Sequence, residues 1–258
     1  MLRHLMHCIV AVAQVLLYKD EWPELLPFIF SCASNASRPD MRHHALTMVS
    51  LLTESCADVL NENIAKVYQM IVDCLADTSL TLWAHAVTCA CKVVGELVDP
   101  EPRKEFRRLL PKFLEILSAC LTANDQKNAR SILLAFVELV SEKEELSFFK
   151  PHLDAVVQAM STIASAPQLS DSLRQFSLEL VVAIIVGEPE LVNALKPKHK
   201  TLLATAMAMC CQLMMTLPAE SGDWGTTCDT SLTDEDDESN YDAAAFGLYR
   251  IAQVTKPK

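Results

Sequence analysis

Apolar residues recur along most of the chain at spacings of three and four, which is the period of one face of an α-helix. Residues 2–18 show the pattern first, with apolar side chains at positions 5, 9, 12 and 16. Stretches with the same spacing follow as far as residue 254 and are separated by short polar segments or by proline. The pattern predicts an all-α protein, because a half-buried strand would alternate apolar and polar residues instead.

A short motif opens the second helix of most of the helical pairs. An apolar residue and an arginine, or a substitute for it, are followed by two positions and then by a small residue, as in Met41–Ala45. The small residues are 41, 43 and 48 positions apart, close to the period of HEAT and armadillo repeats. We therefore expect a HEAT-repeat superhelical solenoid of about five helical hairpins. The four small residues are Ala45, Ala86, Ala129 and Ser177.

The positions of the turns predict a single HEAT array over residues 1–258. Residues 1–18 are expected to form a second helix without a first helix of its own. The last repeat, 190–254, is expected to be interrupted by an acidic loop at 218–240, because so few apolar residues cannot offset the entropy cost of ordering it. The complete repeats are predicted at 22–57, 61–98, 103–142 and 148–187.

Charge is concentrated in that loop. The formal net charge is −11, nine acidic residues lie between positions 220 and 242, and no Lys or Arg lies between Lys200 and Arg250. An acidic surface repels phosphates and attracts basic segments, so basic protein partners are expected and direct nucleic-acid binding is not. A solvated loop without a binding role is the alternative. The candidate docking residues are Asp234, Glu235, Asp236, Asp237 and Glu238.

Two tryptophans are further candidates for partner contact, because exposed aromatic side chains often anchor interfaces. Trp224 lies in the acidic loop, and packing against a neighbouring helix is its alternative role. Trp83 takes the arginine position of its repeat, on or beside the surface that the second helices would line. A position in the core between repeats is the alternative that we favour for Trp83.

No signature of an enzyme is present. The chain lacks G-x-S-x-G, a P-loop, G-x-G-x-x-G and H-E-x-x-H. It has only five glycines, and a glycine-rich phosphate-binding loop is therefore not expected. His4, His7 and Cys8 have the spacing of metal ligands on a helix, but no further ligand follows nearby. We therefore expect a protein without catalysis, metal or cofactor.

Cysteine usage and hydropathy indicate the compartment. The ten cysteines form no C-x-x-C pair and lie mostly within apolar runs, which predicts buried free thiols in a reducing environment. The longest apolar stretch, 205–217, is too short to span a bilayer. We expect a soluble cytosolic or nuclear protein without membrane insertion.

Three stretches resemble the importin-beta (karyopherin-beta) family, closest to the branch that contains importin beta-3, also called importin five. Trp22–Phe28 is similar to the family's recurrent W-P-x-L-L-P-x helix opening, and Leu173–Val181 to an R-Q-x-A-L-E-V helix of that branch. The acidic run 234–240 ahead of residues 243–250 resembles an acidic insertion within one repeat. Because the chain is much shorter than such a receptor, we expect a fragment from the first half of one.

Two positions depart from the family pattern. Trp83 and Gln126 stand where second helices of HEAT repeats often have arginine, which predicts an incomplete ladder of polar contacts between repeats.

The resemblance implies a nuclear transport receptor that binds basic cargo on the concave surface lined by second helices. It also implies cargo release by the GTP-bound small GTPase Ran, contacts with Phe-Gly nucleoporins on the first-helix side, and a location in the cytoplasm, the nucleus and the nuclear pore. The alternative is a HEAT-repeat scaffold of another complex, such as a phosphatase scaffold or a vesicle coat. The acidic insertion favours the receptor, because phosphatase-type scaffolds have shorter and more uniform repeats.

Overall fold

The computed structural model describes residues 2–19, 21–35, 37–141, 146–190, 197–215 and 239–255. Within these ranges the chain forms α-helices and short 3-10 turns and no strand, so the predicted all-α class is confirmed. The helices group into two compact units, Met1–His152 (unit 1) and Leu153–Lys258 (unit 2).

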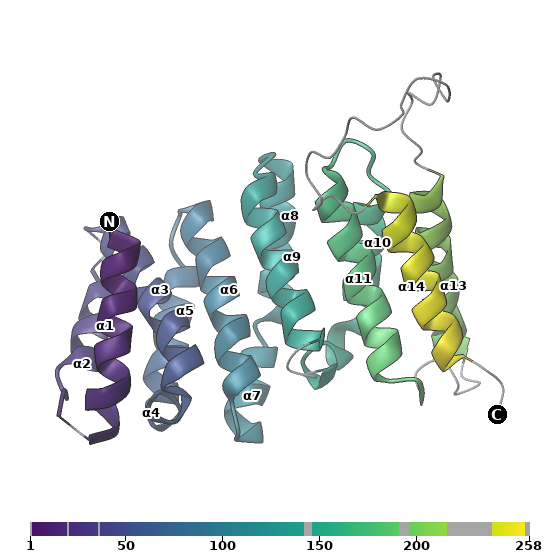
Figure 1. Ribbon diagram of the computed structural model, residues 1–258. Coiled ribbons are helices and arrows are strands. Elements are labelled where there is room, and N and C mark those ends of the chain that lie inside the picture. The colour runs from purple at the N-terminus through teal and green to yellow at the C-terminus, as the bar shows by residue number, and fades with distance from the viewer. Residues whose placement is uncertain are drawn as a thin grey trace, which may run out of the picture. The chain divides into compact units, whose positions relative to one another are not determined.

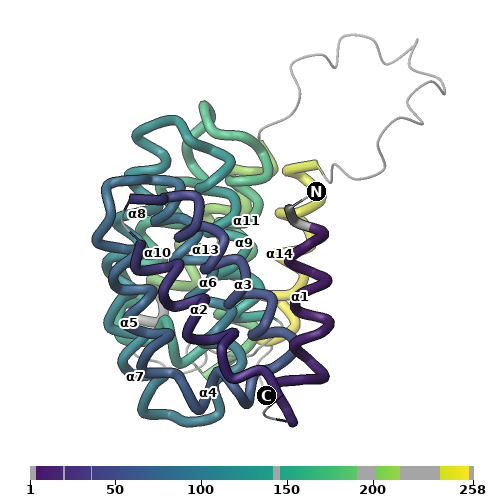
Figure 2. The backbone as a smooth tube through the Cα atoms, turned by 90° about the vertical axis from the view of Figure 1, so that its left-hand side faces the viewer, coloured from purple at the N-terminus to yellow at the C-terminus, as the bar shows by residue number. Residues whose placement is uncertain are grey.

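Unit 1 consists of helical hairpins in two layers (Figure 1). The second helices α3, α6 and α9 pack on one another in order, and each also packs on the first helix of its own hairpin. In Figure 2 the first helices α2 and α5 lie to the left of the second helices α3 and α6. The hairpin helices are α2 (Leu25–Ala33), α3 (Pro39–Ser55), α5 (Ile64–Leu75), α6 (Leu80–Glu96), α8 (Leu110–Thr122) and α9 (Gln126–Ser141).

Two first helices of unit 1 are each preceded by a separate short helix. A short helix α4 (Ala57–Glu62) precedes α5, and α7 (Pro100–Arg107) precedes α8. Helix α7 begins at a proline, which is tolerated there because the first helical amide has no partner within the helix. The break before α8 follows from Pro111, which has no amide hydrogen to donate back to the preceding turn.

Phenylalanine rings close the C-terminal end of unit 1. Phe148 and Phe149 are buried beside two 3-10 turns, η2 (Leu146–Phe148) and η3 (Lys150–His152). Phe148 stacks on Phe113 of α8 with ring centroids 6.4 Å apart, and Phe149 meets Phe136 of α9 edge to face at 5.5 Å. The sequence pattern predicts a helix from residue 148, but α10 begins at Leu153, because these rings are drawn into the core of unit 1.

Helix α1 (Leu2–Leu16) packs on α3, as α3 packs on α6, and so takes the place of a second helix. None of the described helices pairs with α1 as a first helix. Its side chains Leu5, Val12 and Val15 are about half exposed, at 56%, 49% and 56%. Leu5 and Phe28 border an apolar hollow of about 350 Å³ among α1, α2 and α3.

Unit 2 consists of two hairpins with the same layering. The first helices α10 and α13 are in contact, and so are the second helices α11 and α14. Gly247 lets α14 approach α11 closely, because a Cβ atom at this position would lie 3.3 Å from Cγ2 of Val182. The four helices are α10 (Leu153–Ala164), α11 (Asp171–Gly187), α13 (Pro197–Met214) and α14 (Asn240–Val254).

Candidate partner-binding site

The arginine of the repeat motif is buried in unit 1 and holds two hairpins together. Arg42 of α3 has 7% of its surface exposed. Its Nε donates a hydrogen bond to the carbonyl of Ala33 at 3.0 Å, at the end of its own first helix. Its remaining nitrogens reach the next hairpin, where they donate to the carbonyl of Asp73 at 2.8 Å and to the carboxylate of Asp77. The guanidinium therefore connects neighbouring repeats and is occupied structurally.

Trp83 stands at the equivalent position one repeat later and keeps one polar contact. Its indole Nε1 donates to the carbonyl of Asp77 at 2.6 Å, and the ammonium of Lys112 lies 5.5 Å from its ring centroid. Trp83 is half-buried between the α5–α6 turn and α8. Trp83 therefore packs between repeats but is not fully buried in the core, and a role of Trp83 in binding a partner stays a prediction.

Trp224 and the acidic run Asp234, Glu235, Asp236, Asp237 and Glu238 lie outside the described residues. The described chain resumes at Ser239, whose hydroxyl accepts a hydrogen bond from the amide of Asp242 at 3.1 Å and caps α14. The role of Trp224 and the acidic run in docking basic partners stays a prediction from sequence.

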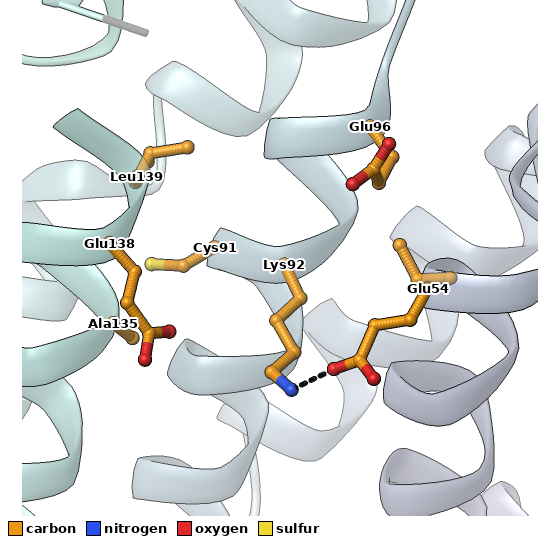
Figure 3. Close-up of a pocket in the computed structure, with 8 residues that line it drawn as sticks. Glu54, Cys91, Lys92, Glu96, Ala135, Glu138 and Leu139 are labelled. Carbon is orange, nitrogen blue, oxygen red and sulfur yellow. Dashed lines mark hydrogen bonds and ion pairs between the residues drawn. The ribbon is translucent and has the colours of Figure 1, made fainter. Parts of the chain in front are cut away.

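The second helices of unit 1 border an acidic groove that sequence reasoning missed (Figure 3). The groove has a volume of about 240 Å³ and crosses three consecutive second helices. Its rim carries three carboxylates and one ammonium, and its floor is made of small and apolar side chains. The lining residues are Thr53 and Glu54 of α3, Cys91, Lys92 and Glu96 of α6, and Ala135, Glu138 and Leu139 of α9.

A recurring position in the sequence produces the three carboxylates. Glu54, Glu96 and Glu138 follow the small residues of their motifs by 9, 10 and 9 positions. When consecutive second helices pack side by side, residues at nearly the same offset from the motif lie near one another, and these three line one groove. Counting acidic residues relative to the motif would have revealed the groove from sequence alone.

The chemistry of the groove suits binding and not catalysis. Lys92 forms an ion pair with Glu54, as the dashed line in Figure 3 marks. Burial, together with Cys89 and the carboxylate of Glu138, raises the pKa of the Cys91 thiol well above its ordinary value, so this thiol stays protonated and unreactive. The groove therefore presents excess negative charge over an uncharged floor.

A second hollow lies on the first-helix side of unit 1. It has a volume of about 320 Å³ and lies between α5 and α7. Tyr68 and Phe106 meet there edge to face with ring centroids 5.1 Å apart. Ile64, Ala65 and Pro102 add apolar surface, and Glu101 and Glu105 complete the lining. Its shape and lining suit a single aromatic or aliphatic side chain of a partner.

The cysteines of the described ranges are free, as predicted. Burial raises the pKa of the Cys120 thiol to about 11, and burial with the neighbouring Cys211 does the same for Cys210. Among the described residues, no three His, Cys, Asp or Glu side chains come together in a way that could hold a metal ion. None of the helices described is both long and apolar enough to cross a membrane.

Comparison with known proteins gives the family. A protein-family model described as "IPO5-like, TPR repeats" matches residues 1–159, and a model described as "Importin repeat" matches residues 166–255. A probable importin-5 homolog of Dictyostelium discoideum is 20% identical over 92% of this chain and 22% of its own length. Importin subunit beta-3 of Saccharomyces cerevisiae is 23% identical over 90% of this chain. The chain thus spans about a fifth of the length of these relatives.

Solved structures agree on the fold. Kap121p bound to Nup53p superposes with a TM-score of 0.69 over 90% of this chain and 21% of that chain, at 20% identity. Kap121p bound to Pho4p gives the same TM-score of 0.69 at 20% identity, over 22% of its length. The predicted HEAT-repeat solenoid is thereby confirmed. The chain belongs to the importin-beta (karyopherin-beta) family, in its importin-5-like branch.

Proposed function

We propose that this chain forms part of a nuclear transport receptor and that its acidic groove binds a lysine- or arginine-rich segment of a cargo protein. The observation that carries the proposal is the row of Glu54, Glu96 and Glu138 on three consecutive second helices. Carboxylates spaced by the repeat can pair with successive basic side chains of an extended peptide. Each exposed pair contributes about 0.2–1 kcal/mol, so affinity comes from several pairs together and falls with salt.

Relatives support this assignment. Kap121p has been solved bound to Pho4p and to the SUMO protease Ulp1p, and a carrier of this kind must take up varied proteins. The acidic run at 234–238 would add a second source of negative charge for the same class of partner. Family membership favours the receptor over a phosphatase scaffold or a vesicle coat and over any enzymatic role.

The proposed receptor also contacts nucleoporins. Kap121p has been solved bound to Nup53p. The hollow beside Tyr68 and Phe106 has the size and enough apolar surface to take the phenylalanine of a Phe-Gly repeat. Release of cargo by GTP-bound Ran, and traffic between cytoplasm and nucleus through the pore, complete the proposal.

A binding titration tests the groove. The fluorescence anisotropy of a labelled hexalysine peptide is measured with the wild-type chain and with the triple variant Glu54→Gln, Glu96→Gln and Glu138→Gln. Loss of three weak ion pairs should reduce affinity roughly tenfold. A second variant, in which residues 234–238 are replaced by serine, measures how much the acidic run contributes to the affinity for hexalysine.

The matched control carries the same change of charge on the first-helix side, at Glu101, Glu105 and Glu115. Binding of this control should stay within about twofold of the wild type, because screening confines the effect of distant exposed charges. Equal weakening by both triple variants would show that only net charge matters and would overturn the groove as the docking site. A pull-down from cell extract, eluted with GTP-loaded Ran, then tests the receptor function itself: elution of basic nuclear proteins supports it.

A further inference from the structure

The acidic groove already holds one basic side chain, and it belongs to the protein itself. Lys92 projects from α6, the middle of the three helices, and its ammonium pairs with Glu54 on the α3 side (Figure 3). Among the described residues that line the groove it is the only cation, against the three carboxylates of Glu54, Glu96 and Glu138. The groove is thus built to accept an ammonium group, and its own lysine supplies one.

The Lys92–Glu54 pair is open to exchange. The Lys92 side chain is 38% exposed and the Glu54 side chain 52%, so water reaches both partners. Ion pairs at this exposure are weak, and the lysine stem has four rotatable bonds that allow the ammonium to leave without moving α6. The rest of the groove does not depend on the pair, because its floor is formed by Cys91, Ala135 and Leu139.

We propose that Lys92 is a built-in competitor that sets the affinity and selectivity of the groove for basic segments. This proposal rests on the proposed function. When no partner is bound, the Lys92 ammonium forms an ion pair with the Glu54 carboxylate. A partner's basic side chain must displace it, so the apparent affinity is reduced by the fraction of molecules in which Glu54 is free.

The same competition gives selectivity for arginine over lysine. An incoming lysine offers Glu54 the same single ammonium that Lys92 already provides. An incoming arginine offers a planar guanidinium that donates two parallel hydrogen bonds to one carboxylate. Arginine therefore displaces Lys92 more readily than lysine does, and partners rich in arginine are favoured.

The test measures the affinity of labelled hexalysine and hexaarginine peptides for the Lys92→Met variant. To isolate the groove, every chain in the series carries serine at residues 234–238. Removing the competitor should tighten hexalysine binding roughly two- to fivefold and hexaarginine binding by a smaller factor. The double variant Lys92→Met with Glu54→Gln should lose this gain, because the freed carboxylate is its source.

Lys104→Met is the matched control, since Lys104 forms an exposed ion pair with Glu101 on α7 and its loss changes the net charge equally. Equal tightening by the Lys104 and Lys92 variants, or an equal gain for both peptides, would overturn the competitor role. If Glu96→Gln and Glu138→Gln weaken hexalysine binding while Lys92→Met leaves it unchanged, only this inference fails. If none of the groove variants alters binding, the proposed function of the groove fails together with it.

Discussion

Two junctions between neighbouring second helices, α3–α6 in unit 1 and α11–α14 in unit 2, use the same buried residue in different ways. Arg42 and Arg174 are 7% and 5% exposed. Each donates from Nε to the last turn of its own first helix, Arg42 to Ala33 at 3.0 Å and Arg174 to Ala164 at 3.1 Å. This shared contact satisfies a carbonyl that a helix end leaves without a partner in the helix.

The junctions differ in what connects one repeat to the next. Arg42 spans the gap itself and pairs with Asp77 of the following hairpin. Arg174 turns back to Asp171 of its own helix at 3.4 Å. There Asn240 of α14 donates to Asp171 at 2.6 Å and accepts from Gln175 at 3.2 Å. Arg250 of α14 also forms an ion pair with Glu179 of α11 at 2.7 Å, so the link combines an amide relay with a separate salt bridge. The arginine is thus needed to complete its own hairpin, whereas the connection between hairpins tolerates different chemistry.

Of the substitutions considered, Arg42→Met is expected to lower the free energy of unfolding the most. The substitution removes a buried guanidinium that bonds to two hairpins and leaves two carbonyls and Asp77 without it, at a cost of about 3–5 kcal/mol in the free energy of unfolding. Arg174→Met should cost less, about 1–3 kcal/mol, because its partners lie within one hairpin and Asp171 keeps Asn240. Urea denaturation followed by circular dichroism measures both. Arg38→Met, which breaks an exposed pair with Asp40, is the control and should change little.

If the two buried variants were equally unstable, the distinction between a spanning and a local arginine would be wrong. Hydrogen exchange sharpens the test, since Arg42→Met should deprotect both α3 and the α5–α6 turn, while Arg174→Met should deprotect mainly the end of α10.

A smaller effect is expected from Gly247→Val at the α11–α14 junction. The added Cβ would lie 3.3 Å from Val182 and 3.7 Å from the thiol of Cys210, and the two further methyl groups need space that the packed helices do not provide. Overpacking of this kind costs about 1–3 kcal/mol. The control is Ala252→Val, an exposed position on the same helix. If the Gly247→Val variant were as stable as the wild type, close packing of α14 against α11 at Gly247 would not contribute to stability.

Breaking the relay through Asn240 should reduce the stability less again. Asn240→Ala removes the hydrogen bonds to Asp171 and Gln175 from a side chain that is 7% exposed, with an expected loss of about 1–2 kcal/mol. Hydrogen exchange in the first turn of α14 is the measurement. Tyr241→Phe, on the exposed face of the same turn, should leave protection unchanged. Unchanged protection in Asn240→Ala would show that the relay does not join the hairpins.

The sequence predicted the features that depend on local pattern. Helical period and the repeat motif give the hairpins, because each second helix must bury the same stripe. They also identify Trp83 as a substitute for arginine, although its bond to the carbonyl of Asp77 required the structure.

Features that depend on spatial neighbours were missed. Phe148 leaves the predicted helix because its partner ring, Phe113, is distant in sequence. The groove glutamates are far apart in sequence and resemble other exposed charged residues there, because only the packing of the repeats brings them together.

The last difference between the junctions concerns pH. His43 of α3 and His85 of α6 lie with ring centroids 3.9 Å apart, a contact that the described residues of the α11–α14 junction lack. Burial, with His43 and Lys127 near by, lowers the pKa of His85 to about 4, and burial with His44 lowers the pKa of His43. A lowered pKa means that the folded state favours the neutral ring. The associated stability is complete above the unfolded value of about 6.5 and is lost as pH falls toward 4. Because the rings are partly exposed, we expect a loss of about 1 kcal/mol.

Urea denaturation at about pH 7 and about pH 4, the two ends of this window, measures the loss in the wild type and in His85→Asn. Asparagine is a conservative test, because Asn128 occupies the equivalent position in the next repeat. The variant should lose the part of the pH dependence that His85 causes, while Arg174→Met should retain it. If His85→Asn destabilises at neutral pH and keeps the full acid sensitivity, the histidine contact is packing alone, and the carboxylates of the chain cause the acid response.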